Sequence, residues 1–477
     1  MQRRDFLSAT LSTACLGSLA SGLRAAVEEP LCAGRTFASP QLAMAADPER
    51  LLFVTCIAAG EKTSRPDYLA TVDLDQKSAT YSQVVGRLAM PHAGDELHHF
   101  GWNTCASCHA LPGHCRRYLV VPGLRSSRIH IVDGADPRGL KLHKVIEPEQ
   151  IAARTNLSAP HTVHCLPSGQ IMISMLGDAQ GNAPGGFLLL DEQFEIAGRW
   201  DPADSPLKFN YDFWYQPRHN VMVSSEWAAP RTFGPGFKLE DVKAGKYGSR
   251  LNFWDWKERK LLESIDLGSG GLIPLEVRFH HDPASTHGFV GAALASTVWH
   301  WHRPADRWQV EKVIEVEPVE LAGWPFPLPG LITDQLLSLD DRWLYFSNWL
   351  HGDLRQYDIS NPSKPRLAAQ LWCGGLLGKA QKVRGRTLAG GPQMLQLSLD
   401  GKRLFVTNSL YSSWDDQFYP QLGKSGSYLL QIECDTQRGG LRMNEDFYVD
   451  FGKEPGGAAR AHEMRFPDGD CTSDIWV

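Results

Sequence analysis

Two stretches of this chain match closely and lie sixty residues apart. The first is Leu337-Ser338-Leu339-Asp340-Asp341-Arg342-Trp343-Leu344-Tyr345-Phe346-Ser347-Asn348, and the second is Leu397-Ser398-Leu399-Asp400-Gly401-Lys402-Arg403-Leu404-Phe405-Val406-Thr407-Asn408. Each copy predicts a strand, an Asp-containing turn and a second strand, which together make a β-hairpin. Looser copies run from Cys165 to Ser174 and from Gln216 to Ser224. A hairpin that returns along the chain indicates a repeat architecture.

A second element recurs with the hairpins, a short alternating strand that often ends in Asp before a turn. Its seven copies run from Tyr68 to Asp73, Arg128 to Asp133, Gly186 to Asp191, Arg250 to Asp255, Thr297 to His302, Leu354 to Asp358 and Tyr428 to Asp435. Their spacing of roughly 50 to 75 residues is in the range of propeller blades with loop insertions. Three or four short strands per unit, repeated seven times, predict an all-β fold, a seven-bladed β-propeller. Two β-sandwich domains would not produce so regular a recurrence.

The two ends of the chain carry strands without partners of their own. We expect Leu51 to Ile57 and Ala461 to Val477 to share one blade, so that the ring is closed by pairing of the N- and C-terminal segments. Closure removes the exposed sheet edges that an open ring would leave.

The N-terminus predicts export. Arg3-Arg4-Asp5-Phe6-Leu7 is a twin-arginine pattern, and an apolar run from Ser8 to Leu23 follows it. We therefore expect residues 1–26 to be a twin-arginine signal peptide, residues 27–477 to be a single β-propeller domain, and the protein to be periplasmic. No later segment is apolar enough for a transmembrane helix.

Charge and cysteine content narrow the function further. The net charge is −6 and no basic stripe offsets it, which argues against nucleic-acid binding. Nine of the ten cysteines follow the signal segment, so at least one is not in a disulfide within the chain. An oxidising compartment permits disulfides. The sequence gives no indication of the oligomeric state.

The most reactive-looking stretch is Cys105-Ala106-Ser107-Cys108-His109. Its CxxCH spacing matches the attachment signature of a c-type haem, although the twin-arginine route carries folded proteins and covalent haem attachment needs an open chain. A thiol in a CxxC motif often has a lowered pKa, which would make Cys105 or Cys108 reactive or allow a redox disulfide. A disulfide that staples the loop, with Cys115 as a further partner, is the third interpretation.

Polar side chains gather on the segments expected to be innermost in each blade. They are Asp95, Glu96, His98 and His99; His161 and His164; Tyr211 and Asp212; Glu276, His280 and His281; Asp334; Gln393; and His462 and Glu463, with His351 in a nearby loop. A propeller brings such positions together around one axis. Converging neutral imidazoles suit copper, zinc or iron, and carboxylates such as Glu96 and Glu463 would orient the rings.

Several long stretches of the chain resemble the selenium-binding protein family, whose bacterial members are methanethiol oxidases. They are Asp95 to His99, Gly101 to Cys105, Phe213 to Asn220, Phe346 to Asp358, Asp450 to Pro455 and Gly469 to Cys471. His109 and His280 depart from the family pattern. The resemblance implies a seven-bladed propeller and a copper-dependent conversion of methanethiol, oxygen and water to formaldehyde, hydrogen sulfide and hydrogen peroxide.

The resemblance also assigns residues. It implies a selenium- or thiol-binding site at Cys105, with Cys108 as a second candidate thiol, and catalytic roles for Cys105, His98 and His99. The candidate copper ligands are His98, His99, His161, His164, His281, His351 and His462. Trp102 and Trp349 are expected to form a small apolar wall for methanethiol. The alternative is a non-catalytic periplasmic protein that binds selenium, thiols or copper.

Overall fold

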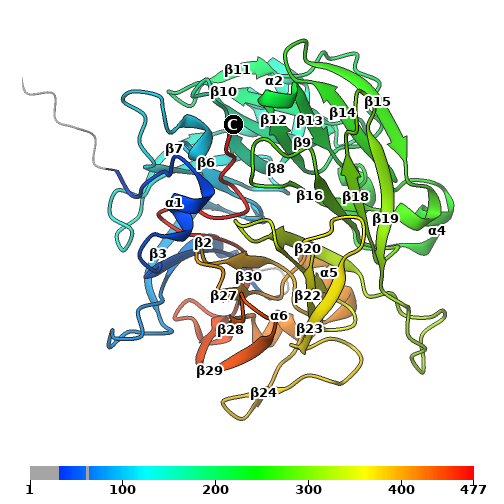
Figure 1. The fold of residues 1–477 in the computed structure, drawn as a ribbon. Helices are drawn as coiled ribbons and strands as arrows, with labels where there is room; N and C mark the ends of the chain where they lie inside the picture. The colour runs from blue at the N-terminus through cyan, green and yellow to red at the C-terminus, as the bar shows by residue number, and fades with distance from the viewer. Residues whose placement is uncertain (1–31, 61–63) are drawn as a thin grey trace, which may run out of the picture. The chain divides into compact units, whose positions relative to one another are not determined.

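The computed structural model describes residues 32–60 and 64–477. The predicted signal peptide, residues 1–26, and its boundary with the propeller lie outside the described residues. Within those residues, seven four-stranded antiparallel sheets form a ring (Figure 1). The predicted all-β, seven-bladed propeller is therefore confirmed.

Each blade consists of four strands, ordered from the innermost to the outermost. Four of the blades are β30 (Ala459–Arg465), β1 (Leu51–Ala58), β2 (Pro66–Asp73) and β3 (Val84–Ala93); β4 (Gly101–Trp102), β5 (Tyr118–Pro122), β6 (Ile129–Asp133) and β7 (Lys141–Ile146); β8 (Leu157–Cys165), β9 (Ile171–Asp178), β10 (Gly186–Leu190) and β11 (Ile196–Arg199); and β12 (Phe213–Gln216), β13 (Val221–Ser224), β14 (Arg250–Asp255) and β15 (Lys260–Asp266). The other three are β16 (Pro274–Phe279), β17 (Gly288–Ala292), β18 (Thr297–His302) and β19 (Gln309–Glu315); β20 (Ile332–Leu337), β21 (Trp343–Asn348), β22 (Asp353–Asp358) and β23 (Arg366–Trp372); and β26 (Leu395–Leu397), β27 (Arg403–Val406), β28 (Tyr428–Cys434) and β29 (Leu441–Asp450).

The remaining elements are short and lie between strands. They are the hairpin of β24 (Lys382–Val383) and β25 (Arg386–Thr387), the helices α1 (Pro40–Met44), α2 (Pro148–Thr155), α3 (Pro230–Phe233), α4 (Leu239–Lys243), α5 (Ser412–Phe418) and α6 (Leu422–Ser425), and four 3₁₀ turns, η1 (Ala106–Cys108), η2 (Pro217–His219), η3 (Gly268–Gly271) and η4 (Phe451–Lys453). Among the described residues, no helix has the length and apolar character needed to cross a membrane.

The repeated hairpins form the two inner strands of their blades, and the same turn chemistry closes each. The Ser338 hydroxyl donates to Asp340 and accepts the backbone N–H of Trp343 at 2.9 Å. Ser398 does the same with Asp400 and with the N–H of Arg403, also at 2.9 Å. Side chains that satisfy backbone groups within a turn favour that turn. All seven copies of the Asp-ended element fall on the third strand of a blade.

The ring closes by pairing the two ends of the described chain. β30 runs antiparallel to β1, with Phe53 opposite Arg465 and Val54 opposite Met464. The expected pairing is thus confirmed up to Arg465. Beyond it the prediction of a strand is wrong, because Pro467 offers no backbone N–H and Gly469 takes a left-handed φ of 110°.

The C-terminal tail, residues 466–477, instead turns into the ring (Figure 1), and it is buried except at Pro467, Asp468 and Val477. The Asp474 carboxylate pairs with Arg116 and accepts the backbone N–H of Ala106 at 2.7 Å. The Trp476 carbonyl accepts the side-chain amide of Gln216 at 3.0 Å. The tail therefore joins the second blade to the fourth at the end of the channel where β4 and β8 finish.

Candidate functional site

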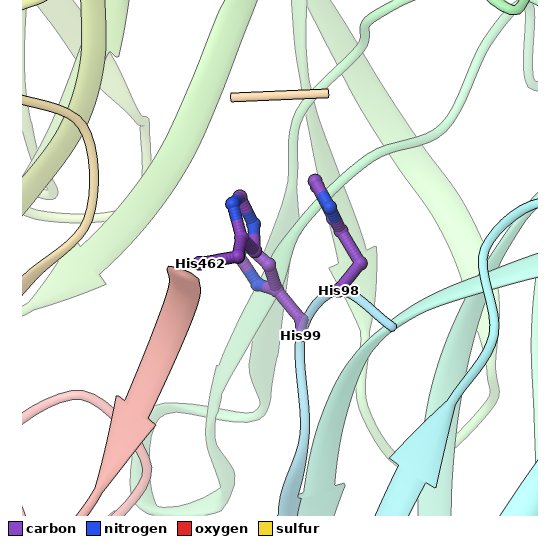
Figure 2. A group of neighbouring side chains, drawn as sticks. All are labelled: His98, His99 and His462. Atoms are coloured by element: carbon purple, nitrogen blue, oxygen red, sulfur yellow. The ribbon is translucent and has the colours of Figure 1, made fainter. Parts of the chain in front are cut away.

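Four histidines meet among the innermost strands, away from the C-terminal tail. His98 and His99 precede β4, His161 lies on β8 and His462 lies on β30. Figure 2 shows the rings of His98, His99 and His462 turned toward one another from two different blades. Strands that are far apart in sequence therefore bring these side chains together, as the propeller hypothesis predicted.

His98, His99 and His462 are close enough to share one ion, and the ring of His161 packs against that of His99. One ring nitrogen from each of His98, His99 and His462 lies within 4.8 Å of the others. The ring centroids of His98 and His462 are 3.7 Å apart, and those of His99 and His161 are 3.9 Å apart. A single coordination sphere can therefore be formed by small side-chain rotations.

The hydrogen bonds of this cluster leave nitrogen atoms facing inward. Nδ1 of His462 pairs with the carbonyl of Ser409 at 2.7 Å, and Nδ1 of His161 pairs with the hydroxyl of Thr162 at 3.0 Å. The Nε2 atoms of His99, His161 and His462 and the Nδ1 atom of His98 are buried and have no hydrogen-bond partner among the described residues. Buried polar atoms are normally paired. Nε2 of His99 faces Oε1 of Glu276 at 3.6 Å, so the nitrogens of His98, His161 and His462 are the three that need a partner. A metal ion that prefers imidazole ligands fits that requirement.

The cluster is also electrostatically suited to a cation. Burial lowers the pKa of His98, His99 and His161 well below the usual value, and the neighbouring imidazoles lower it further. Burial lowers the pKa of His462 to about 3. The four rings are therefore neutral at neutral pH, and only neutral imidazole binds metal.

A layer of buried acids and arginines lies directly behind the histidines. Nε2 of His99 is 3.6 Å from Oε1 of Glu276, and its Nδ1 is 3.6 Å from Oε1 of Glu463. Arg278 donates to Glu276 at 2.7 Å, and Arg465 donates to Glu463 at 2.5 Å. Burial raises the pKa of Glu463 to about 8, although Arg465 opposes that rise. Glu463 and Glu276 therefore border the cluster as orienting carboxyls, as expected for Glu463.

A small apolar cavity of about 20 Å³ lies beside His98. Its wall consists of His98, Tyr211, Trp227, Ile273, Leu275, Ala293, Leu331, Thr333, Leu410 and Trp414. The expectation that Trp102 and Trp349 form the wall is wrong. The indole N–H of Trp102 donates to the carbonyl of Phe466 at 3.0 Å, and Trp349 packs edge-on against Tyr419 at 4.8 Å. Both are core residues.

The other three candidate ligands lie apart from the cluster. His164 packs between Phe213 and Trp214, with centroids 5.1 and 5.2 Å away. His281 lies near the tail, with Nε2 3.3 Å from the carbonyl of Leu337. His351 is hydrogen-bonded through Nε2 to the carbonyl of Leu328 at 2.9 Å. The structure thus separates the seven predicted ligands into a cluster of four and three isolated rings.

Glu96 does not border the histidines. Its carboxylate accepts Arg125 at 2.6 Å and the backbone N–H of Ser412 at 2.7 Å. Tyr211, which was expected on an innermost segment but for which no role was predicted, does border the histidines, with its ring 4.1 Å from that of His161. Burial raises the pKa of Tyr211 well above its usual value, so it is a neutral phenol. Its place on an innermost segment was the available signal.

The cysteine loop lies at the opposite end of the channel. Cys105 forms a disulfide with Cys165, the last residue of β8, and Cys115 forms one with Cys32. His161 precedes Cys165 by four strand residues, which is about 13 Å of extended chain. The disulfide and the histidine cluster are therefore separate sites.

The arrangement changes the expectations for the CxxCH motif. Cys108 is buried, its thiol donates to the carbonyl of Leu166 at 2.9 Å, and burial raises its pKa, so the expected lowering is wrong. Cys105 pairs with Cys165 rather than with Cys108 or Cys115. Two haem thioethers need both sulfurs, and one is already bonded. The ring of His109 contacts the hydroxyl of Thr36 at 2.9 Å.

Comparisons with known proteins agree on the family to which this chain is related. The family model described as 56 kDa selenium binding protein (SBP56) matches residues 31–477. Proteins named methanethiol oxidase from Xenopus laevis and Homo sapiens are 53% and 54% identical over 465 residues, which is 93% of this chain and 98% of each of those proteins. Selenium-binding protein 2 from Mus musculus is 54% identical over the same length.

Solved structures agree. A hypothetical selenium-binding protein from Sulfolobus tokodaii is 43% identical and superposes with a TM-score of 0.87, covering 92% of this chain and 98% of that one. The periplasmic gluconolactonase of Pseudomonas aeruginosa, 12% identical with a TM-score of 0.54 over 87% of this chain and 99% of that one, shares the fold alone. The chain belongs to the 56 kDa selenium-binding protein family.

Proposed function

We propose that this protein is a methanethiol oxidase that converts methanethiol, oxygen and water to formaldehyde, hydrogen sulfide and hydrogen peroxide. The observation that carries the proposal is the cluster of buried, unpartnered imidazole nitrogens beside a small apolar cavity. The names of relatives that are 53% and 54% identical over nearly their whole length support the same activity.

Copper is the proposed cofactor, held by His98, His99, His161 and His462. The donor set fits, because four neutral imidazoles suit copper and each has a nitrogen without a hydrogen-bond partner among the described residues. When bound, copper would supply a soft site for the substrate sulfur and a route for electrons to oxygen. Zinc fits the same ligands but cannot change its oxidation state.

The protein's own residues would orient the ligands and shape the substrate site. The carbonyl of Ser409 accepts the Nδ1 proton of His462, which leaves the Nε2 lone pair directed toward the other rings. Glu463 would orient His99 in the same way from 3.6 Å. The cavity beside His98 would take the methyl group of methanethiol and exclude water from it.

A second candidate is selenium or thiol binding at the cysteine loop without turnover. The family description and the buried free thiol of Cys108 beside the Cys105–Cys165 disulfide support it. Replacing Cys105 by Ser separates the two functions. Oxidase activity that survives the change would assign catalysis to the histidine cluster and leave the cysteines a binding or structural role.

We also propose a periplasmic location with export by the twin-arginine route. The N-terminal pattern supports it, and so do two disulfides, which persist in oxidising compartments. Fractionation of cells that express the chain with Arg3 and Arg4 replaced by Lys tests the proposal. Unchanged periplasmic protein would contradict it.

The oxidase proposal is tested on the purified full chain with and without copper. Copper-dependent oxygen uptake with methanethiol, together with formaldehyde and sulfide as products, is expected. His462→Ala should abolish the uptake, and His351→Ala, which removes a histidine outside the cluster, should retain it. No copper-dependent uptake by the unaltered protein, or equal loss in both variants, would overturn the proposal.

A further inference from the structure

We infer a second metal site, outside the channel, formed by His287, His300 and His302 and suited to zinc or copper. The three histidines lie in the blade of β16 to β19, and one ring nitrogen from each lies within 4.8 Å of the others. The site does not depend on the proposed oxidase activity, because it shares no residue with the histidine cluster of the channel.

Strand register explains why these side chains meet. Residues 300 and 302 of β18 point to the same face of the sheet because successive strand residues alternate. Gly288 pairs with Trp301, which places His287 opposite His302 on the neighbouring strand. Glu311 of β19 pairs with His300. Three imidazoles and one carboxylate therefore occupy adjacent positions on one face.

The rings are arranged around a common centre. Each pair is nearly parallel, with 7° between the ring planes, and the centroids are 5.0, 5.3 and 5.1 Å apart. The centre of such a triangle is about 3.0 Å from each centroid. An ion at that centre is within reach of all three rings once their nitrogens are turned toward it, because a metal–nitrogen bond of about 2.0 Å and about 1.1 Å from nitrogen to ring centre span that distance.

His287 and His300 face each other edge to edge rather than face to face. Their nearest nitrogens, Nδ1 and Nε2, are 2.8 Å apart although the ring centroids are 5.0 Å apart. Two nitrogens bound to one tetrahedral ion at about 2.0 to 2.1 Å lie about 3.3 Å apart. Rotation of both rings toward the centre, with the nitrogens moving apart by about half an ångström and the Nδ1 proton of His287 moving to Nε2, would exchange this hydrogen bond for two coordinate bonds.

The surroundings of the rings favour coordination. Nδ1 of His300 is 3.3 Å from Oε1 of Glu311, so the carboxylate holds the proton on Nδ1 and leaves Nε2 as a lone pair. This is the carboxylate–histidine–metal arrangement of protein metal sites. Nδ1 of His302 is buried and has no hydrogen-bond partner among the described residues. An all-nitrogen donor set excludes calcium and magnesium as good fits.

Two of the three side chains are only partly buried, which keeps the site within reach of ions in solution. His287 and His302 are of intermediate exposure, and His300 beneath them is fully buried. Three protein ligands leave the fourth tetrahedral position for water or another small donor. The geometry is thus that of an open site rather than of a closed structural one.

Titration of the full chain, without a polyhistidine tag, with zinc tests the inference. We expect two tight sites in the unaltered protein, and one after His302→Ala or His287→Ala, with affinity at the lost site reduced at least about 100-fold. His143→Ala, which removes a histidine that packs against Tyr118 and lies outside both clusters, should keep both. Glu311→Gln should weaken the second site about 10- to 100-fold. His462→Ala should remove the channel site alone, so the two sites fail separately.

Crystals soaked in zinc provide a readout that does not depend on variants. An anomalous peak between the three rings is expected at the zinc edge. Absence of that peak, or equal zinc stoichiometry and affinity in the His302→Ala, His287→Ala and unaltered proteins, would overturn the inference.

Discussion

Copper should raise the melting temperature of this protein through the channel histidines, and His462→Ala should remove that effect. A ligand that binds only the folded state at a concentration 100 times its Kd stabilises it by about 2.7 kcal/mol. For a chain with roughly 440 described residues, the unfolding entropy is about 0.9 kcal/mol/K at about 2.1 cal/mol/K per residue. The expected increase is therefore about 3 °C.

His351→Ala is the matched control. Each of the two histidines donates one ring hydrogen bond to a buried carbonyl, His462 to Ser409 and His351 to Leu328. Either change leaves such a carbonyl without its partner, at a cost of about 1–3 kcal/mol, so both variants should melt lower without metal. Only His351→Ala should regain the increase of about 3 °C when copper is added.

Scanning fluorimetry with and without copper measures this difference directly. All the variants are made in the His302→Ala background, so that the site on the blade of β16 to β19 does not contribute to the change. Equal copper-induced shifts in the two variants would refute the assignment of the ligands. A shift lost in His351→Ala alone would place the metal elsewhere.

Three further predictions concern the cavity, the tail and the pH dependence of stability. Ala293→Leu, which narrows the cavity, should lower kcat/KM for ethanethiol at least about tenfold more than for methanethiol, since one methylene is worth about 1–3 kcal/mol in a tight pocket. Asp474→Asn should leave the buried Arg116 unpaired, which costs about 3–5 kcal/mol and, at the unfolding entropy given above, lowers the melting temperature by about 3–5 °C. Asp468→Asn, which removes a charge from an exposed pair, should change the melting temperature by less than about 1 °C. Burial raises the pKa of Asp415 from 3.8 to about 7, so between these pH values the folded state holds one proton more than the unfolded state. The free energy of unfolding should therefore fall as the pH rises from about 4 to 7, by up to about 1.4 kcal/mol per pH unit from this group. Asp415→Asn should flatten that slope.

Each of these has a result that would contradict it. Equal losses for both thiols would mean that the cavity does not hold the alkyl group. Equal melting shifts for the two aspartate variants would mean that the tail ion pair contributes no more than a surface pair. An unchanged slope in thermal unfolding between pH 4 and 7 would remove Asp415 as its source.

The blades could be predicted because the residues that close each hairpin lie close together in the sequence. The Ser338–Asp340 and Ser398–Asp400 turns satisfy their own backbone within a few residues, so the pattern is visible in the sequence. The tail after Arg465 could not be predicted in the same way. Its conformation depends on Arg116, which is 358 residues from Asp474.

The ligand set was only partly predictable for a geometric reason. Strand alternation indicates which face a side chain occupies but not its height along the channel. His161 and His164 lie on the same innermost strand, yet only His161 is level with His98 and His462. The cavity wall was harder still to predict, since Trp227 follows β13 and Trp414 lies on α5, in insertions of different blades.

Closure of the ring by β30 has a consequence for the biosynthesis of the site. His462 follows His98 and His99 by more than 360 residues, so it leaves the ribosome long after they do. The three rings meet only when β30 docks beside β1. A chain that stops early, or that stalls before its ends pair, therefore lacks one side of the cluster. The proposed metal occupancy of the channel would then report that the ring has closed.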